Sequence, residues 1–391
     1  MSPRYRPALL AAAALLLGAF VAPASAAAST AASGPITAVA YQIGVSHDGY
    51  SGDTSIVPPL THQWSRNFGG AVSYPLISGG AVFVTVANSG STSGTKLYAL
   101  TQSTGATIWS KPISGTYNWS NAAFDAGQVF VVNSDGLLKS FNATTGELDW
   151  SVQLPGQYLF SSPPTASNGV VYVGGAGDGG TLYAVSESSG QVLWTQPVAN
   201  GDESSPALNG TSVFVSYACG LTYSFARTTG AQQWFHNGPC EGGGGKTPVV
   251  SGGSVYMRDP INGNEILNAK TGKQTGTFAA GPAPAFDGQV GLFLNQGTLT
   301  AVTDGTTQWS FAGDGGLDSA PIVVDSTVYV GSSSGELYGL AVSTGKQVWS
   351  TNVGSGIVAP NEQGGPPLTG LGAGQGLLVV PAGDRLAAYS G

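Results

Sequence analysis

The feature of this sequence that most constrains its fold is a repeat of roughly 40 residues, which runs from Thr61 to the end of the chain. The clearest part of each copy is a strand, a small turn ending in Gly, and a second strand with Trp four residues after that Gly. A short apolar strand and a proline-containing strand come before most copies. Each period therefore holds four antiparallel strands, which is one blade of a β-propeller.

The two ends of the repeat are incomplete in complementary ways. The chain ends at the turn position Gly391 with no Trp strand after it, whereas the tract begins with a Trp strand at residues 61–68. Together they complete one blade. We therefore predict an all-β, eight-bladed β-propeller of four-stranded antiparallel blades, closed by an N-terminal strand that completes the last blade. The eight outer strands are centred on positions 64, 109, 150, 194, 234, 276, 309 and 349.

The repeated Gly and Trp are predicted to be structural. Gly supplies the positive φ that the turn requires, and an outer-strand Trp offers a large apolar area for packing against the next blade. One copy departs from the pattern, because Gly276 stands where Trp is expected. The structural tryptophans are Trp64, Trp109, Trp150, Trp194, Trp234, Trp309 and Trp349.

The first 26 residues have the pattern of a cleavable Sec-type signal peptide. Arg4 and Arg6 precede an apolar run over residues 8–21, and a small-residue cleavage site follows at residues 24–26. This segment has no cysteine for a lipid anchor, and no later stretch is long and apolar enough to span a membrane. We predict a signal peptide (1–26), a linker and extended arm (27–60) and a propeller (61–391) in a secreted or extracytoplasmic protein.

Charge and cysteine content narrow the classes of partner. Removal of the signal peptide takes away two of the 13 basic residues and none of the 21 acidic ones, which leaves a net charge of −10. Such a surface repels phosphate backbones, so we do not expect a nucleic-acid partner.

Cys219 and Cys240 are the only cysteines. In an oxidising compartment we predict a disulfide; a metal site is the alternative, but only His236 is close in sequence.

The repeat unit, Ala-(Leu or Val)-x-x-x-Thr-Gly-x-x-x-Trp, is similar to the quinoprotein-type repeat, named after pyrroloquinoline quinone (PQQ). That repeat occurs in PQQ-dependent alcohol dehydrogenases and in the propeller lipoprotein of the outer-membrane barrel-assembly machinery. Residues 40–49 and 58–60, followed by Trp64, also resemble the N-terminal arm of secreted PQQ-like repeat proteins. The resemblance covers nearly the whole mature chain and implies the propeller fold, but a fold does not fix a function.

The sequence departs from both functional types of that family. It has no adjacent cysteine pair of the kind that quinoprotein dehydrogenases carry beside the cofactor, no C-x-x-C-H haem motif and no lipidated cysteine of the assembly lipoprotein. We therefore expect no cofactor, because no motif supports PQQ or calcium. The usual Asp of the repeat, three residues before the Thr of Thr-Gly, is replaced in six copies by Thr101, Asn142, Ser186, Ala226, Asn268 and Ala341.

Candidate site residues gather in the linkers between blades and in the turns between second and third strands. In a propeller these segments share one face, around the central channel. We predict there a concave acidic and aromatic site for a cation, a sugar or a cationic peptide; the plainer explanation is that loops are polar because they are solvated. The candidate residues are Tyr74, Tyr117, Trp119, Tyr158, Asp202, Glu203, Glu241, Lys246, Arg258, Asp314, Asp318 and Glu362.

Two functions fit these observations. The first is a non-catalytic, exported scaffold, expected to be a monomer, that binds a protein or a saccharide at the cell surface through its linker face. The second is an enzyme, either a quinoprotein-like oxidoreductase or a metal-assisted lyase or hydrolase that uses the same carboxylates.

Overall fold

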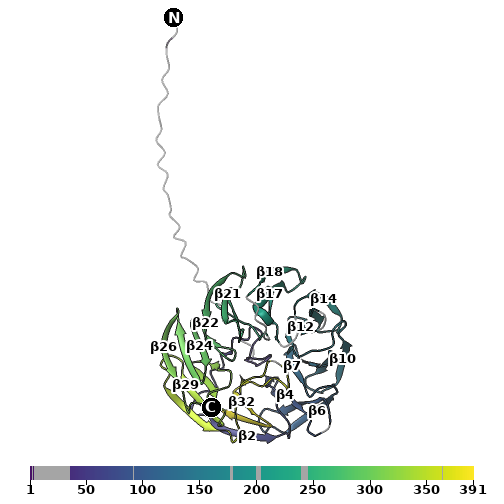
Figure 1. Ribbon diagram of the computed structural model, residues 1–391, viewed down its shortest axis with the longest axis vertical. Helices are drawn as coiled ribbons and strands as arrows, with labels where there is room; N and C mark the ends of the chain where they lie inside the picture. The colour runs from purple at the N-terminus through teal and green to yellow at the C-terminus, as the bar shows by residue number, and fades with distance from the viewer. Residues whose placement is uncertain are drawn as a thin grey trace. The chain divides into compact units, whose positions relative to one another are not determined.

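The chain folds into a ring of blades. The computed structural model describes residues 1, 3, 36–90, 92–176, 179–199, 204–238, 245–362 and 364–391. From residue 36 onward these form eight sheets arranged around a centre (Figure 1). The one helix among the described residues is a 3-10 turn, η1 (Ala218–Gly220). The predicted all-β, eight-bladed propeller is confirmed.

Each blade is a meander of antiparallel strands, numbered outward from the ring centre. Blades 1 to 4 consist of β3 (Leu76–Ser78), β4 (Ala81–Ala87), β5 (Thr95–Thr101), β6 (Thr107–Ile113); β7 (Ser120–Asp125), β8 (Gln128–Asn133), β9 (Leu137–Asn142), β10 (Leu148–Gln153); β11 (Thr165–Ser167), β12 (Val170–Gly175), β13 (Thr181–Ser186), β14 (Val192–Pro197); and β15 (Ala207–Leu208), β16 (Ser212–Tyr217), β17 (Leu221–Ala226), β18 (Gln232–His236). Blades 5 to 7 consist of β19 (Val249–Ser251), β20 (Ser254–Met257), β21 (Asn264–Asn268), β22 (Gln274–Phe278); β23 (Ala285–Asp287), β24 (Val290–Asn295), β25 (Thr298–Thr303), β26 (Thr306–Phe311); and β27 (Ile322–Val324), β28 (Thr327–Gly331), β29 (Glu336–Ala341), β30 (Gln347–Asn352).

Blade 8 is built from both ends of the repeat tract. Its strands are β31 (Gly372–Gly374), β32 (Leu377–Ala382), β33 (Arg385–Ser390) and, outermost, β2 (Thr61–Asn67). The last two pair antiparallel, with Thr61 opposite Ser390 and Asn67 opposite Arg385. The predicted closure by an N-terminal strand is confirmed, and it leaves no open seam in the ring.

A β-bulge in the outer pair of strands aims each tryptophan. In blade 1, Trp109 lies opposite Ala99 but Thr107 lies opposite Leu100, so Ile108 is the extra residue. A bulge bends and twists its strand, which re-aims the neighbouring side chain. Trp109 consequently points toward blade 2, where its indole Nε1 donates to Ala143 O at 3.0 Å.

An arm before β2 fills the ring centre, which the sequence analysis did not foresee. Its short strand β1 (Tyr50–Ser51) pairs in parallel with β27. Main-chain or side-chain hydrogen bonds tie residues 36–51 to the innermost strand of blades 1 to 7 and, in blade 8, to the turn just after the innermost strand. The blade residues bonded to the arm are Ile77, Phe124, Thr165, Leu208, Val250, Phe286, Val323 and Gln375.

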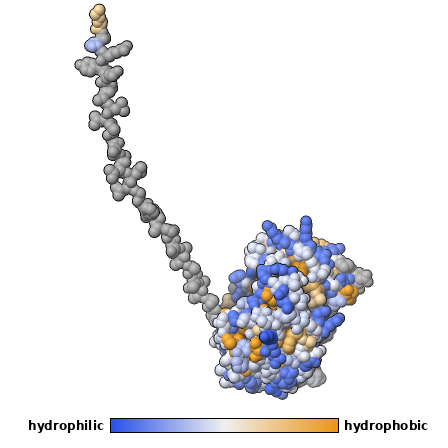
Figure 2. Space-filling view, turned by 90° about the vertical axis from the view of Figure 1, so that its left-hand side faces the viewer, coloured by the Kyte–Doolittle hydropathy of each residue, from blue (hydrophilic) through white to orange (hydrophobic). Residues whose placement is uncertain are grey.

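The apolar core lies between adjacent blades. The second strand of each blade except blades 5 and 6 is almost wholly buried; in blade 1, Val82, Phe83 and Val84 are at most 1% exposed. The outer surface is largely hydrophilic with scattered hydrophobic residues (Figure 2). Within the described residues, no helix has the length and apolar character needed to cross a membrane.

Candidate functional site

The predicted linker-face residues separate into three groups in the structure. Arg258, Glu362 and Lys246 lie near the ring axis, Tyr117 and Trp119 line a pocket beside it, and the others stand apart. Asp202, Glu203 and Glu241 lie outside the described residues. So does Cys240, and the disulfide therefore stays a prediction; Cys219 lies in η1, between the second and third strands of blade 4.

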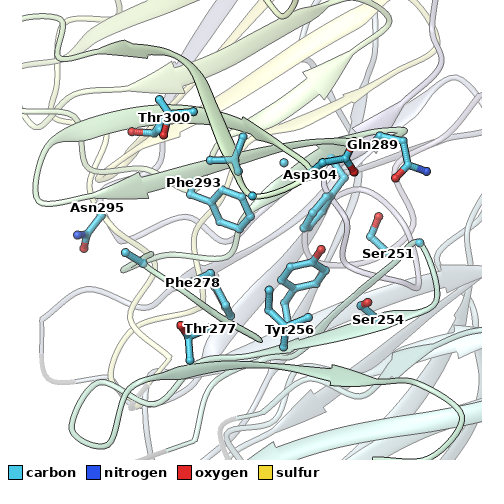
Figure 3. Close-up of a pocket in the computed structure, with 18 of the residues that line it drawn as sticks. Ser251, Ser254, Tyr256, Thr277, Phe278, Gln289, Phe293, Asn295, Thr300 and Asp304 are labelled. Carbon is cyan, nitrogen blue, oxygen red and sulfur yellow. The ribbon is translucent and has the colours of Figure 1, made fainter. Parts of the chain in front are cut away.

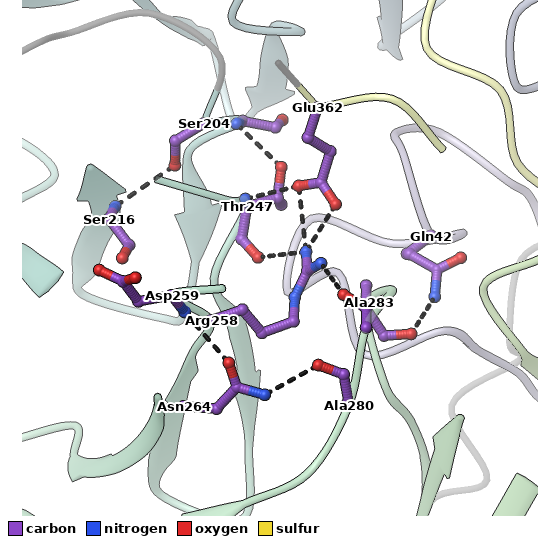
Figure 4. A network of polar contacts seen from close by, with 12 residues as sticks. Gln42, Ser204, Ser216, Thr247, Arg258, Asp259, Asn264, Ala280, Ala283 and Glu362 are labelled. Carbon is purple, nitrogen blue, oxygen red and sulfur yellow. Dashed lines mark hydrogen bonds and ion pairs between the residues drawn. The ribbon is translucent and has the colours of Figure 1, made fainter. Parts of the chain in front are cut away.

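A buried ion pair, Arg258 with Glu362, joins two segments of the linker face (Figure 4). Arg258 follows β20, and Glu362 comes from the long linker between blades 7 and 8. Arg258 Nη2 donates to both carboxylate oxygens of Glu362, at 2.8 and 3.0 Å, and to Thr247 O at 3.0 Å. Glu362 Oε2 also accepts from the backbone N–H of Thr247 at 2.7 Å. This network ties the blade 7–8 linker to blade 5.

Burial sets the protonation of the groups around that pair. Lys246 has a lowered pKa because it is desolvated and lies near the positive charge of Arg258, which outweighs the opposing effect of Glu362. On the arm side, burial raises the pKa of Tyr41 well above its usual value and lowers that of His47. The two ring nitrogens of His47 face carbonyl oxygens, Nδ1 that of Tyr41 at 2.7 Å and Nε2 that of Pro206 at 3.1 Å, and the neutral ring can donate to only one of them.

The axis of the ring does not fit a quinone cofactor. Tyr41, Gln42 and His47 occupy it from the arm side and are at most 1% exposed. From the linker side Arg258 Nη2 donates to both carboxylate oxygens of Glu362, so the positive charge of the guanidinium already has a protein counter-charge and is not available to an anionic cofactor. Nor do any three His, Cys, Asp or Glu side chains in the described part of the chain come together as a metal site would require.

A pocket on the linker face collects aromatic side chains from two successive linkers. A cavity of about 550 Å³ is lined by Tyr117, Asn118 and Trp119 from the blade 1–2 linker and by residues 159–161 from the blade 2–3 linker, with residues 364–366 across from them. Tyr117 is 59% exposed, whereas Trp119 is buried. The pocket therefore has an aromatic wall that is partly open to solvent.

Two polar atoms in this pocket have no hydrogen-bond partner within the described part of the chain. They are Asn118 Oδ1 and Ser161 Oγ, both buried. The Asn118 amide nitrogen, by contrast, donates to Asn88 O at 3.3 Å, which fixes the orientation of the side chain. A buried polar atom without a partner costs free energy, and a ligand that supplies one recovers it. The site is suited to an apolar or aromatic group with an attached amide or hydroxyl.

The remaining predicted residues have other surroundings. Tyr74 is buried, and its hydroxyl donates to Ala122 O at 2.6 Å. Tyr158 is 77% exposed beside the pocket. Asp318 accepts from Ala359 N–H at 2.9 Å, which joins two linkers. Asp314 is exposed and has a lowered pKa because the hydroxyls of Ser334 and Ser332 donate to it.

The prediction of site residues missed Asn118, Ser161 and the segment 364–366. Asn118 lies between two predicted aromatic residues, so its position in the linker was a usable signal. No sequence signal marks the segment 364–366, because its approach to Trp119 depends on how the blade 7–8 linker folds over the ring.

Comparison with known proteins places the chain among PQQ-type propellers. It is 26% identical over 261 residues to outer membrane protein assembly factor BamB of Yersinia pestis (63% of this chain, 61% of that protein). It is 27% identical over 275 residues to tetrathionate hydrolase of Acidithiobacillus ferrooxidans (61% and 54%). The chain thus spans less than two thirds of the length of these curated relatives.

Solved structures show the same fold at low identity. BamB from Moraxella catarrhalis superposes with a TM-score of 0.65 and 17% identity, over 85% of this chain and all of that one. Quinohemoprotein alcohol dehydrogenase ADHIIG from Pseudomonas putida HK5 gives 0.69 and 13%, over 90% and 80%. The PQQ_2 family, described as outer membrane protein assembly factor BamB, matches residues 55–274 and 295–391. This chain belongs to that family, as its propeller and its repeat both indicate.

Proposed function

We propose that this chain is an exported, non-catalytic scaffold that binds a partner protein through the aromatic pocket on its linker face. The observation that carries the proposal is the pocket of Tyr117, Trp119 and residues 159–161, with two buried polar atoms that have no partner among the described residues. Membership of a family named for an assembly factor supports a protein partner. The occupant would be an apolar or aromatic side chain whose backbone amide donates to Asn118 Oδ1.

Photo-crosslinking in cells that export the protein tests this proposal. A benzophenone amino acid at position 117 should yield a discrete cross-linked protein, and the same group at Leu148, which is exposed on an outer strand, should not. Tyr117→Ala should weaken capture of that protein roughly tenfold while the melting temperature stays unchanged. Equal cross-linking at both positions would contradict the proposal.

Two further measurements separate the other functions. Binding on a glycan array that is lost in Tyr117→Ala would assign the pocket to a saccharide instead. Turnover of an alcohol or aldose in a dye-reduction assay, after incubation with PQQ and calcium, would make the chain an enzyme. The packing of Arg258 against Glu362 on the axis supports the expectation of no turnover.

Export is part of the proposal and has its own tests. Mass spectrometry of the secreted protein should find a mature N-terminus at residue 27. An oxidising compartment would join Cys219 to Cys240, so thiol titration of the unfolded, unreduced protein should detect no free thiol. Two free thiols would refute the disulfide without affecting the pocket.

A further inference from the structure

The interface between blades 5 and 6 departs from the repeat on both of its sides. Blade 5 presents Gly276 where the other blades present tryptophan. In blade 6, only Asp304 and Gly305 separate β25 from β26, whereas residues 102–106 separate the matching strands of blade 1. Both turn residues have positive φ, +49° and +74°, as in a tight type I′ hairpin. The family match omits residues 275–294, which include Gly276 but not the turn of blade 6.

At six of the seven other interfaces in the ring a tryptophan fills this space in one repeated way. The indole N–H donates to a backbone carbonyl of the next blade, and the ring covers the Gly of that blade's outer turn. A Cβ on Gly146 would lie 2.6 Å from the Trp109 ring, so indole and glycine are in close contact. In the other five pairs the distance from such a Cβ to the nearest indole atom is 2.5 to 2.7 Å. These pairs are Trp64 with Gly105, Trp150 with Gly190, Trp194 with Gly230, Trp234 with Gly272 and Trp309 with Gly345.

At the blade 5–6 interface the corresponding space is empty. A Cβ on Gly305 would meet no atom within 4 Å, and one on Gly276 would meet only Ile266 Cδ1, at 3.5 Å. A cavity of about 610 Å³ opens there between β20–β22 and β24–β26 (Figure 3). This volume lies within the range of ligand sites in proteins. We call it the 276 slot.

Aromatic side chains in the slot lack the partner that they have in other blades. Tyr256 occupies the position of Phe214, which packs on the indole of Trp234 with ring centroids 5.8 Å apart. With no indole in blade 5, Tyr256 instead packs on Phe278 at 5.4 Å and on Phe286 at 4.6 Å, and it stays half-buried. Phe293 adds a second ring across the slot (Figure 3).

The rest of the lining restricts the charge of an occupant. Hydroxyl and amide groups surround the aromatic rings, among them Ser254, Thr300 and Asn295. Among the described residues that line the slot, Asp304 is the only charged one. An acidic ligand is therefore disfavoured, and a neutral or positively charged one is favoured by charge complementarity.

This chain has no tryptophan left for the slot. Seven of its eight tryptophans donate to a neighbouring blade, and the eighth, Trp119, is buried in the linker-face pocket. The donor–acceptor pairs are Trp64 to Gln102, Trp109 to Ala143, Trp150 to Glu187, Trp194 to Arg227, Trp234 to Ala269, Trp309 to Val342 and Trp349 to Leu60. An indole for the slot must come from another molecule.

We propose that the 276 slot binds a tryptophan side chain on an extended segment of a partner protein, which completes the ring of indoles from outside. The indole would cover Gly305 and contact Tyr256, as Trp234 covers Gly272 and contacts Phe214 in the preceding blade. This site is separate from the linker-face pocket, because its lining comes from blade strands and from turns outside the linkers that form that pocket.

A peptide that copies residues 190–197, with its tryptophan replaced by 5-fluorotryptophan, is the probe. Titration followed by ¹⁹F NMR should show saturable binding to the full-length mature protein. The same peptide with Ala at that position should bind at least tenfold more weakly by calorimetry. Equal affinities of the Trp and Ala peptides would overturn the proposal.

Two slot variants and one control locate the binding. Gly276→Trp should fill the slot from within, lower peptide affinity at least tenfold and raise the melting temperature. Its backbone φ is not positive, and the space above it is open. Thr300→Arg should also block binding and serves if the first variant does not fold. Thr144→Arg, on an exposed turn of blade 2, should leave affinity unchanged.

Which variants lose peptide binding decides whether the proposal holds. Peptide binding that survives both slot variants would overturn the proposal. So would glycan-array binding that Gly276→Trp abolishes while the Trp peptide fails to bind, because the slot would then be a saccharide site. Tyr117→Ala should leave peptide binding intact, so failure of the linker-face proposal is distinguishable from failure of this one.

Discussion

Arg258 and Glu362 are 104 residues apart in sequence, yet one guanidinium nitrogen of Arg258 contacts both carboxylate oxygens of Glu362. The pair lies on the ring axis with side chains at most 1% exposed. Because Glu362 also accepts from Thr247 N–H, one carboxylate links the blade 7–8 linker to two segments of the blade 5 region. The linker that bounds the aromatic pocket at residues 364–366 is thus anchored immediately before it.

Removing one partner of this pair should strongly destabilise the protein. Glu362→Ala leaves a buried guanidinium without its counter-charge, which costs roughly 3–5 kcal/mol of unfolding free energy. The double change Arg258→Met with Glu362→Leu should recover much of that loss, since apolar side chains of similar size need no pairing. Urea unfolding measures both. A single variant within about 1 kcal/mol of wild type would show that water reaches Arg258.

Because most turn glycines contact an indole, we predict that the same substitution costs different amounts of unfolding free energy at two equivalent turns. Gly146→Ala and Gly305→Ala both place a Cβ at positive φ, +69° and +74°. Only the first Cβ meets an indole, at 2.6 Å from Trp109. Gly146→Ala should therefore cost roughly 1–3 kcal/mol more than Gly305→Ala, the usual cost of overpacking. Equal losses in chemical denaturation would mean that the backbone strain alone is responsible.

The architecture could be predicted from the sequence because its determinants are local and repeated. The spacing from Gly105 to Trp109 recurs along the chain, and each copy specifies a turn and an outward strand. The incomplete ends at Thr61 and Gly391 then fix the closure. Gly276 was visible as an exception, but the empty space beside it depends also on the short turn of blade 6, across the interface.

The site was less predictable because linkers do not repeat. Tyr74 and Tyr117 both lie in linkers between blades, yet one is buried with its hydroxyl on Ala122 O and the other is 59% exposed. The path of the arm through the ring centre decides this for Tyr74, since Tyr41 packs on it with ring centroids 5.6 Å apart. No local pattern in the sequence encodes that contact.

The raised pKa of the Glu187 carboxyl group leads us to predict that the free energy of unfolding falls as pH rises. Burial raises its pKa to about 7, and the nearby carboxyl of Asp125 adds to the effect. Between the ordinary value of 4.5 and about 7, the folded protein holds a proton that the unfolded chain has released. The free energy of unfolding must therefore decrease with pH across this window.

The variant Glu187→Gln removes that ionisation. It should be more stable than wild type at pH 8, and this advantage should vanish at pH 4, where Glu187 is protonated in both states. Thermal unfolding across the range measures the difference. Glu147→Gln, at an exposed position in the matching region of blade 2, is the control and should show no such trend. Parallel pH profiles for wild type and Glu187→Gln would place the carboxyl in water.

Because the last strand closes the ring, we predict that the melting temperature of the protein depends strongly on it. Ending the chain after Asp384 deletes β33, which separates β2 from β32 in blade 8. The deletion also removes four buried side chains, Leu386, Ala387, Ala388 and Tyr389. Burial of a large apolar side chain is worth about 1.5–3 kcal/mol, so the melting temperature should fall by at least several degrees.

A matched truncation separates closure from a general effect of shortening the chain. Ending at Ser390 removes Gly391 alone and keeps every pair between β2 and β33. It should therefore melt like the full-length protein in a calorimeter. If the chain ending at Asp384 also melts like the full-length protein, β2 does not hold blade 8 together and the ring is stabilised elsewhere. In that case the arm, which forms hydrogen bonds with every blade, would be the element that keeps the ring closed.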